Sequence, residues 1–125
     1  MRASRLNVNF AGLELDNPTV LASGILGYSA ESLASIVEGG AGAVVTKSVG
    51  ATPRAGYANP TVVQTKCGLI NAMGLPNPGI NAYVQEIRHA KTALSVPIIV
   101  SIYGYSAEEY AAVARKAAEA GADAL

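Results

Sequence analysis

Residues 71–79, which read Asn-Ala-Met-Gly-Leu-Pro-Asn-Pro-Gly, form the segment of this sequence best suited to bind a small ligand. Asn71 supplies a side-chain amide that can both donate and accept hydrogen bonds. Gly74 lets the backbone come close to a ligand, and Met73, Gly74 and Leu75 can each offer a backbone N–H. Free N–H groups beside an amide favour a bound carboxylate or phosphate. We therefore predict a recognition loop for a small planar anion.

A helix start directly after this loop would strengthen its attraction for an anion. We expect Asn77 to cap a helix that begins at Pro78, where the missing N–H of proline costs nothing. The same residue types also suit an ordinary connection from a strand to a helix. Their spacing alone does not separate the two interpretations.

Lys47 is the second residue with clear chemical potential, because it follows residues 43–46, an apolar run that is typical of a buried strand. At the end of such a strand its ammonium could neutralise a bound anion or an anionic reduced cofactor. It could also form a Schiff base if its pKa were lowered. The alternative is a lysine that extends from the strand end into solvent.

The single histidine and the single cysteine fit structural positions better than catalytic ones. His89 lies between charged neighbours on an expected helix, so we predict a solvent-exposed side chain and no metal site. Cys67 has no second cysteine with which to form an internal disulfide, and we expect a small residue within a hairpin.

The composition points to one modest domain of the α/β class. Of the 125 residues, 50% are hydrophobic and 14% are charged, with nine acidic and nine basic side chains. This balance gives no electrostatic footprint for nucleic acid. The sequence has no basic leader followed by an apolar run and no segment long enough to span a bilayer, so we expect a cytoplasmic protein without a membrane or nucleic-acid partner.

Strand and helix patterns alternate along the sequence. We expect buried strands at residues 19–22, 43–46 and 97–102, and the beginning of a fourth strand at residues 122–125. Helices are expected at residues 29–38 and 106–120, and the helix that begins at Pro78 is marked by apolar residues from Ile80 to Leu94 and ends before Pro97. Two hairpins are expected as well, one joining residues 6–10 to 13–15 and the other joining residues 62–65 to 68–70.

An internal repeat supports this division, because the sequence Gly-Tyr-Ser-Ala-Glu occurs at residues 27–31 and again at residues 104–108. Both copies would open a helix, with Ser29 and Ser106 as N-caps, and Glu109 would complete a capping box. Repeated β/α units predict a parallel sheet, most simply a (β/α)8 barrel. The match could also reflect coincidence and shared capping chemistry.

A complete (β/α)8 barrel needs about 250 residues. We therefore interpret residues 1–125 as one partial domain, the N-terminal half of a TIM barrel preceded by a β-hairpin. Active sites of such barrels lie at the carboxyl ends of the strands. The side chains or backbone expected at those ends belong to Ser23, Gly24, Lys47, Ser48 and Ser101.

Four motifs, in this order, closely resemble the first half of the class 1 dihydroorotate dehydrogenases: Ala22-Ser23-Gly24, Thr46-Lys47-Ser48, Asn59-Pro60 and the segment 71–79. The resemblance covers essentially the whole chain. It implies a (β/α)8 barrel that carries FMN and oxidises dihydroorotate to orotate, a step of de novo pyrimidine (UMP) biosynthesis, with hydride transfer to flavin N5.

The resemblance also implies a role for individual residues. FMN would contact Ala22, Ser23, Gly24, Lys47, Ser48 and Ser101. The substrate would contact Lys47, Asn71, Ala72, Met73, Gly74 and Leu75. The family's general base, a Cys or Ser in the loop after the fourth strand, would lie beyond Leu125, so no catalytic base is expected here. We expect that these 125 residues alone neither bind FMN tightly nor turn over.

Within the family, residues 73–79 together with residues 101–104 look more like the NAD-linked type than the fumarate-linked type. That type pairs with a subunit carrying FAD and an iron–sulfur cluster. The resemblance thus implies a homodimer or a heterotetramer as the assembled enzyme.

Three other interpretations of the sequence stay open. One is another FMN barrel that acts on pyrimidines, such as a dihydropyrimidine dehydrogenase domain or a dihydrouridine synthase; the latter should show basic tracts for RNA. A second is a Schiff-base lyase that uses Lys47. A third is a non-catalytic half-barrel that assembles with another chain.

Overall fold

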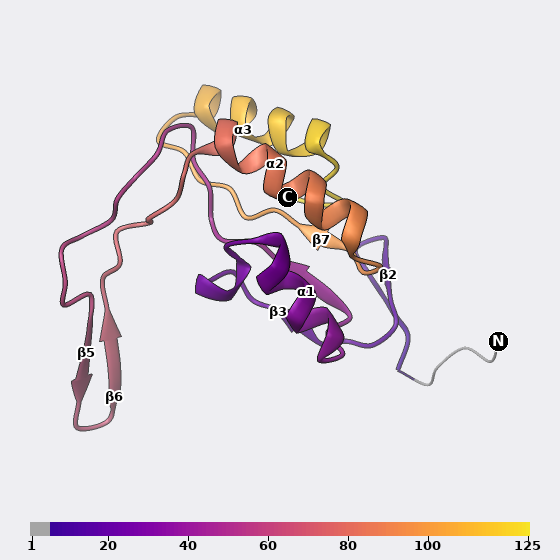
Figure 1. The fold of residues 1–125 in the computed structure, drawn as a ribbon, viewed down its shortest axis with the longest axis horizontal. Coiled ribbons are helices and arrows are strands. Elements are labelled where there is room, and N and C mark those ends of the chain that lie inside the picture. Colours follow the sequence, from indigo (N-terminus) through magenta and orange to yellow (C-terminus); the bar gives the residue numbers. More distant parts are fainter. Residues whose placement is uncertain (1–5) are drawn as a thin grey trace.

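A computed structural model describes residues 6–125. Its centre is a parallel sheet of three short strands in the order β3 (Val20–Leu21), β4 (Ala43–Val45) and β7 (Ile98–Ile99). Each strand is followed by a helix before the next strand of the sheet: α1 (Ala30–Glu38), α2 (Ile80–Ala93) and α3 (Ala107–Ala120). The helices pack in chain order, α1 against α2 and α2 against α3 (Figure 1). The predicted parallel β/α architecture is confirmed.

The parallel pairing continues beyond the three strands. Val20 pairs with Ala43 and Val44 with Ile98, which sets the register of the sheet. An isolated parallel bridge joins Ile99 to Ala124, so the chain enters a fourth strand position where the sequence predicted one.

The core lies between the sheet and the helices. Its buried members are Ala30, Leu33, Val44, Val49, Ile80, Tyr83, Ile87, Ala90, Ile98, Val100, Val113, Ala117 and Ala120. On each helix these residues recur at spacings of three and four, which places them on one face, as the apolar pattern predicted. These faces pack against the buried residues of the sheet, and this packing fixes the positions of the strand ends.

Strand β3 is less buried than predicted. Val20 keeps 39% of its surface exposed, whereas Ala43 and Val44 on the adjacent strand are fully buried. The difference follows from position, because β3 is the edge of the described sheet and pairs on one side only.

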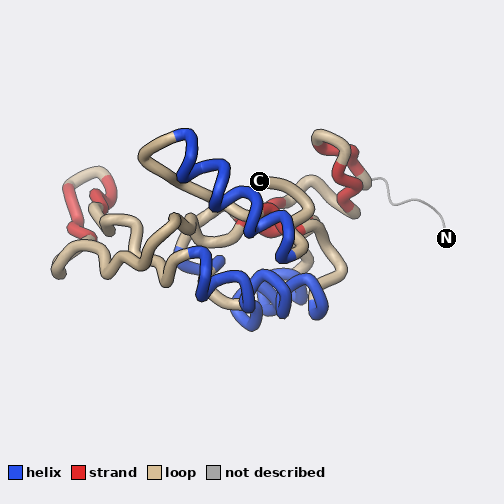
Figure 2. The backbone as a smooth tube through the Cα atoms, turned by 90° about the horizontal axis from the view of Figure 1, so that it is seen from above, coloured by secondary structure: helices blue, strands red, loops and turns tan. Residues whose placement is uncertain are grey.

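Both predicted hairpins are present, and they lie at opposite ends of the molecule (Figure 2). The first pairs β1 (Val8–Phe10) with β2 (Leu13–Leu15), and the second pairs β5 (Val62–Thr65) with β6 (Gly68–Asn71). Every residue of β5 and β6 is exposed, and this hairpin projects away from the helices (Figure 1). A short 3-10 helix, η1 (Ile25–Gly27), which the sequence did not predict, precedes α1.

The two predicted serine caps are confirmed. Ser29 Oγ accepts a hydrogen bond from the N–H of Ser32, and Ser106 Oγ accepts one from the N–H of Glu109, each at 3.2 Å. Glu109 does not close the capping box on Ser106 itself. Its carboxylate instead accepts from the N–H of Tyr105, one residue earlier, at 2.7 Å.

Replacing Ser29 or Ser106 by alanine should lower the free energy of unfolding by about 1 kcal/mol in each case, because one N–H at a helix start loses its acceptor. Urea denaturation measures the loss. Ser35→Ala is the matched control, since Ser35 is exposed within α1 and caps no helix. An equal loss in the control would contradict the capping interpretation.

Candidate functional site

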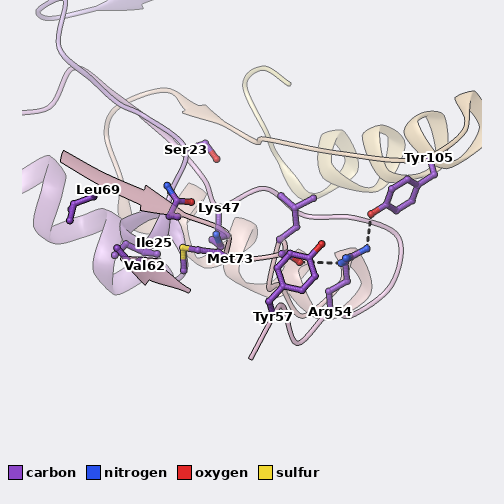
Figure 3. A pocket seen from close by; sticks show the side chains of 13 residues that line it. Ser23, Ile25, Lys47, Arg54, Tyr57, Val62, Leu69, Met73 and Tyr105 are labelled. Carbon is purple, nitrogen blue, oxygen red and sulfur yellow. Dashed lines mark hydrogen bonds between the residues drawn. The ribbon is translucent and has the colours of Figure 1, made fainter. Parts of the chain in front are cut away.

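A cavity of about 690 Å³ lies between the ends of strands β3 and β4, the base of the β5–β6 hairpin and the segment 71–79. Its lining residues are Ser23, Gly24, Ile25, Lys47, Arg54, Tyr57, Val62, Leu69, Asn71, Met73, Gly74, Leu75 and Tyr105. The close-up in Figure 3 shows side chains from these separate segments of the chain around one space. The strand ends and the predicted recognition loop therefore meet at one site.

Three serine hydroxyls form a connected row across the ends of the three strands. Ser23 Oγ lies 3.2 Å from Ser48 Oγ, which lies 2.8 Å from Ser101 Oγ. Ser23 lines the cavity, whereas Ser48 and Ser101 continue the row behind it. In each pair either oxygen can be the donor. We refer to Ser23, Ser48 and Ser101 together as the serine row.

The backbone of Lys47 is anchored by the turn at the end of η1. Its N–H donates to the carbonyl of Gly27 at 2.8 Å, and the buried hydroxyl of Tyr83 donates to the same oxygen at 2.6 Å. Burial raises the pKa of Tyr83 well above its usual value, so the phenol keeps its proton and stays a donor. Strand β4, η1 and α2 thus hold Lys47 in place together.

The charge of the cavity is positive. Lys47 and Arg54 are the two cations among its lining residues, and no carboxylate lines it. No described residue forms a hydrogen bond or ion pair with the Lys47 ammonium. An anion in the cavity would therefore meet two positive charges without competition from an acidic side chain.

Segment 71–79 forms a turn with two successive left-handed residues, Gly74 (φ 74°) and Leu75 (φ 55°). The carbonyl of Met73 accepts from the N–H of Tyr57 at 3.0 Å, and the carbonyl of Gly74 accepts from Arg54 Nε at 3.2 Å. No described residue accepts a hydrogen bond from the N–H groups of Met73, Gly74 and Leu75. The predicted set of available donors is present beside the cavity.

The predicted role of Asn77 is wrong. Helix α2 begins at Ile80 with Gly79 as its N-cap, so Pro78 is not its first residue. The side-chain oxygen of Asn77 instead accepts from the N–H of Gly79 at 2.9 Å, which closes a local turn, and from the N–H of Gly50 at 3.3 Å. The start of α2 does not line the cavity, so the helix dipole is not part of the anion site.

Most of the predicted site residues come together. The cavity is lined by Ser23, Gly24, Lys47, Asn71, Met73, Gly74 and Leu75, and the serine row adds Ser48 and Ser101. Ala22 and Ala72 do not line it. The N–H of Ala72 donates to the carbonyl of Thr61 at 2.8 Å, so it is not available to a ligand.

Sequence reasoning did not predict the contribution of Arg54, Tyr57 and Tyr105. Arg54 donates to the hydroxyl of Tyr105 at 2.6 Å, and its guanidinium carbon lies 5.9 Å from the centre of that ring (Figure 3). The one available sequence signal was that Arg54 is a basic residue in the turn-rich segment between the motif at residues 46–48 and segment 71–79. The exposed positions of His89 and Cys67 agree with their predicted structural roles.

Within residues 6–125 no cluster of three or more His, Cys, Asp or Glu side chains is placed to hold a metal ion. Across the same residues, none of the helices combines the length and the apolar character that crossing a bilayer demands.

Comparison with known proteins gives one consistent result. Residues 5–125 match the family model described as dihydroorotate dehydrogenase. The catalytic subunit of dihydroorotate dehydrogenase B (NAD(+)) from Methanosarcina acetivorans is 50% identical over 118 residues, which cover 94% of this chain and 38% of the relative.

Two further relatives carry the same name. The subunit from Methanocaldococcus jannaschii is 50% identical over 114 residues (89% of this chain, 37% of the relative), and that from Pyrococcus furiosus is 47% identical over 116 residues (93% and 38%). The chain therefore spans less than two fifths of the length of these curated relatives.

Proposed function

Since the chain belongs to the dihydroorotate dehydrogenase family, we propose that the protein carrying it oxidises dihydroorotate to orotate in pyrimidine biosynthesis, with FMN as the hydride acceptor. The observation that carries the proposal is one cavity lined by Lys47, by Ser23 at the end of the serine row, and by the donor-rich turn at Gly74 and Leu75. These groups suit a flavin on one side and an anionic pyrimidine on the other.

The residues at the strand ends fit a flavin. Ser23, backed by the rest of the serine row, offers a donor or an acceptor to the polar edge of the ring system. A Cβ at Gly24 would meet nothing within 4 Å, so the ring can approach the backbone there. Ala22 would contribute backbone contacts only. When bound, FMN would supply a two-electron acceptor for the hydride. Lys47 would stabilise negative charge on the reduced ring.

The recognition loop fits the substrate. Dihydroorotate carries a carboxylate and several ring N–H and C=O groups, which need donors and acceptors in fixed positions. The N–H groups of Met73, Gly74 and Leu75 supply donors, and the Asn71 amide supplies both kinds. A general base would still have to remove the proton next to the carbon that loses hydride. The family resemblance implies a Cys or Ser in the loop after the fourth strand as this base.

The remaining parts of the proposal concern the assembled enzyme. The relatives are named as catalytic subunits of the NAD(+)-linked enzyme, in agreement with the NAD-linked type implied by residues 73–79 together with residues 101–104. We propose a closed (β/α)8 barrel in the full-length protein, a partner subunit with FAD and an iron–sulfur cluster, and a homodimeric or heterotetrameric assembly. The cytoplasmic location also stays a prediction.

The visible absorbance spectrum of the purified full-length polypeptide tests the function. We expect bound FMN whose absorbance near 450 nm bleaches when dihydroorotate is added without oxygen, because the substrate then reduces the flavin. A flavin that dithionite bleaches but dihydroorotate does not would overturn the proposed substrate, and a protein that binds no FMN would overturn the proposed cofactor.

The same measurement on residues 1–125 alone tests a separate expectation. A colourless product that does not turn over is the predicted result. Turnover by this product, with its sequence verified, would show that these residues suffice.

A further inference from the structure

Arg54 connects the recognition loop to the segment between β7 and α3. Its Nε donates to the carbonyl of Gly74 at 3.2 Å, and one of its terminal nitrogens donates to the hydroxyl of Tyr105 at 2.6 Å. The first contact spans 20 residues of sequence and the second spans 51. Both dashed contacts in Figure 3 converge on this one guanidinium.

The next carbonyl of the loop is held in a parallel way. Asn77 Nδ2 donates to the carbonyl of Leu75 at 2.8 Å and to the hydroxyl of Tyr103 at 2.8 Å. The rings of Tyr103 and Tyr105 contact each other edge to face, with centroids 6.1 Å apart. Tyr105 therefore supports Arg54, which holds the carbonyl of Gly74. In the same way Tyr103 supports Asn77, which holds the carbonyl of Leu75.

Holding a carbonyl also orients the N–H of the same peptide group. The peptide bond between Gly74 and Leu75 is planar and trans, so its C=O and N–H point in opposite directions. When Arg54 holds the Gly74 oxygen, it thereby fixes the direction of the Leu75 N–H, which no described residue accepts. This N–H is one of the donors that the proposed function assigns to the substrate.

A long arginine side chain held at one point would sample several rotamers and would leave the turn free to rotate. The hydroxyl of Tyr105 provides the second point. Unlike Asn77, which is 5% exposed and fixed by several partners, Tyr105 is 73% exposed, so its hydroxyl can be removed without disturbing the core. The structure thus offers a clean way to loosen Arg54 alone.

We propose that Tyr105 is a positioning residue for the recognition loop: through Arg54 it sets the direction of the Leu75 N–H toward an anionic ligand. The inference rests on the proposed function, which identifies that ligand as the carboxylate-bearing pyrimidine. Tyr105 itself has no role in the hydride or proton transfer.

The test compares Tyr105→Phe with Tyr110→Phe in the full-length protein. Tyr110 is a matched control because it is also partly exposed, and its hydroxyl forms no hydrogen bond with any described residue. For Tyr105→Phe we expect the dissociation constant of orotate and the KM for dihydroorotate to rise about fivefold, with unchanged kcat and flavin content. The order parameter of the Leu75 amide, measured by NMR relaxation without ligand, should fall, because the peptide group loses its fixed direction. The control should match the unmodified protein in every measurement.

A second comparison isolates the route through Arg54. In an Arg54→Lys background, where the two-point contact is already lost, Tyr105→Phe should add less than a twofold change in orotate affinity. Equal effects in both backgrounds would overturn the inference, as would a Tyr105→Phe protein with unchanged orotate affinity and an unchanged order parameter at the Leu75 amide. If dihydroorotate fails to bleach the unmodified flavoprotein, the proposed function falls, and the order parameter of the Leu75 amide still decides the role of Tyr105.

Discussion

Lys47→Ala should slow the reduction of bound FMN by dihydroorotate at least about a hundredfold, the size of effect found when a preorganised charge is removed from a reacting centre. Lys47 is anchored through its backbone to Gly27, and its ammonium has no described partner that would have to be released. No ion pair has to break before the ammonium meets a ligand, and Arg54 is the only other cation among the lining residues that could compensate for its loss.

Anaerobic stopped-flow absorbance measures this rate directly in the full-length protein. Lys47→Arg keeps the positive charge but not the compact ammonium, and we expect an intermediate rate. Lys66→Ala removes an exposed lysine in the turn between β5 and β6 and should leave the rate unchanged. A Lys47→Ala protein within threefold of the unmodified rate would show that the cavity charge is not used in the reaction.

Gly27→Ala should destabilise the protein by about 3 kcal/mol, near the upper end for overpacking of a filled interior. A Cβ at this position would lie 2.6 Å from Lys47 N, 2.7 Å from the Thr46 carbonyl carbon and 2.7 Å from Val45 O. All three atoms belong to the backbone of strand β4 and the residues after it, so no side-chain rotation relieves the overlap. The hydrogen bonds that the Gly27 carbonyl accepts would shift as well.

The midpoint of urea denaturation reports this loss. Gly68→Ala provides the control, because a Cβ there meets nothing within 4 Å and lies in the exposed hairpin. We expect a change of less than 0.5 kcal/mol for the control. If Gly27→Ala unfolds at the same urea concentration as the control, η1 is free to move away from β4 and does not anchor Lys47.

Local patterns predicted those parts of the fold that depend on local interactions. Ser29 and Ser106 act as caps because the partner N–H lies three residues along the chain, within reach of any sequence window. Lys47 lines the cavity because the end of a buried parallel strand faces one edge of the sheet in every such fold. The same strand-end rule singled out the three members of the serine row, which follow strands β3, β4 and β7, and the family resemblance added their role at FMN.

The errors and omissions concern residues whose partners are distant in sequence. Asn77 looked like a helix cap because asparagine before proline is a common helix start, but its amide is used by Gly50 and Tyr103. The contribution of Arg54 was not predicted because its partners, Gly74 and Tyr105, lie 20 and 51 positions away. Such contacts become visible only when the tertiary fold brings the loops together.

The serine row has a further consequence for any ligand in the cavity. Three hydroxyls that share two hydrogen bonds can run in either direction, with each O–H turning about its own C–O bond. In one direction Ser23 presents a hydrogen to the cavity, and in the other it presents a lone pair. A ligand atom that begins a reaction as an acceptor and ends it as a donor would find a complementary partner at both stages. The polarity of the row can reverse while every heavy atom stays where it is.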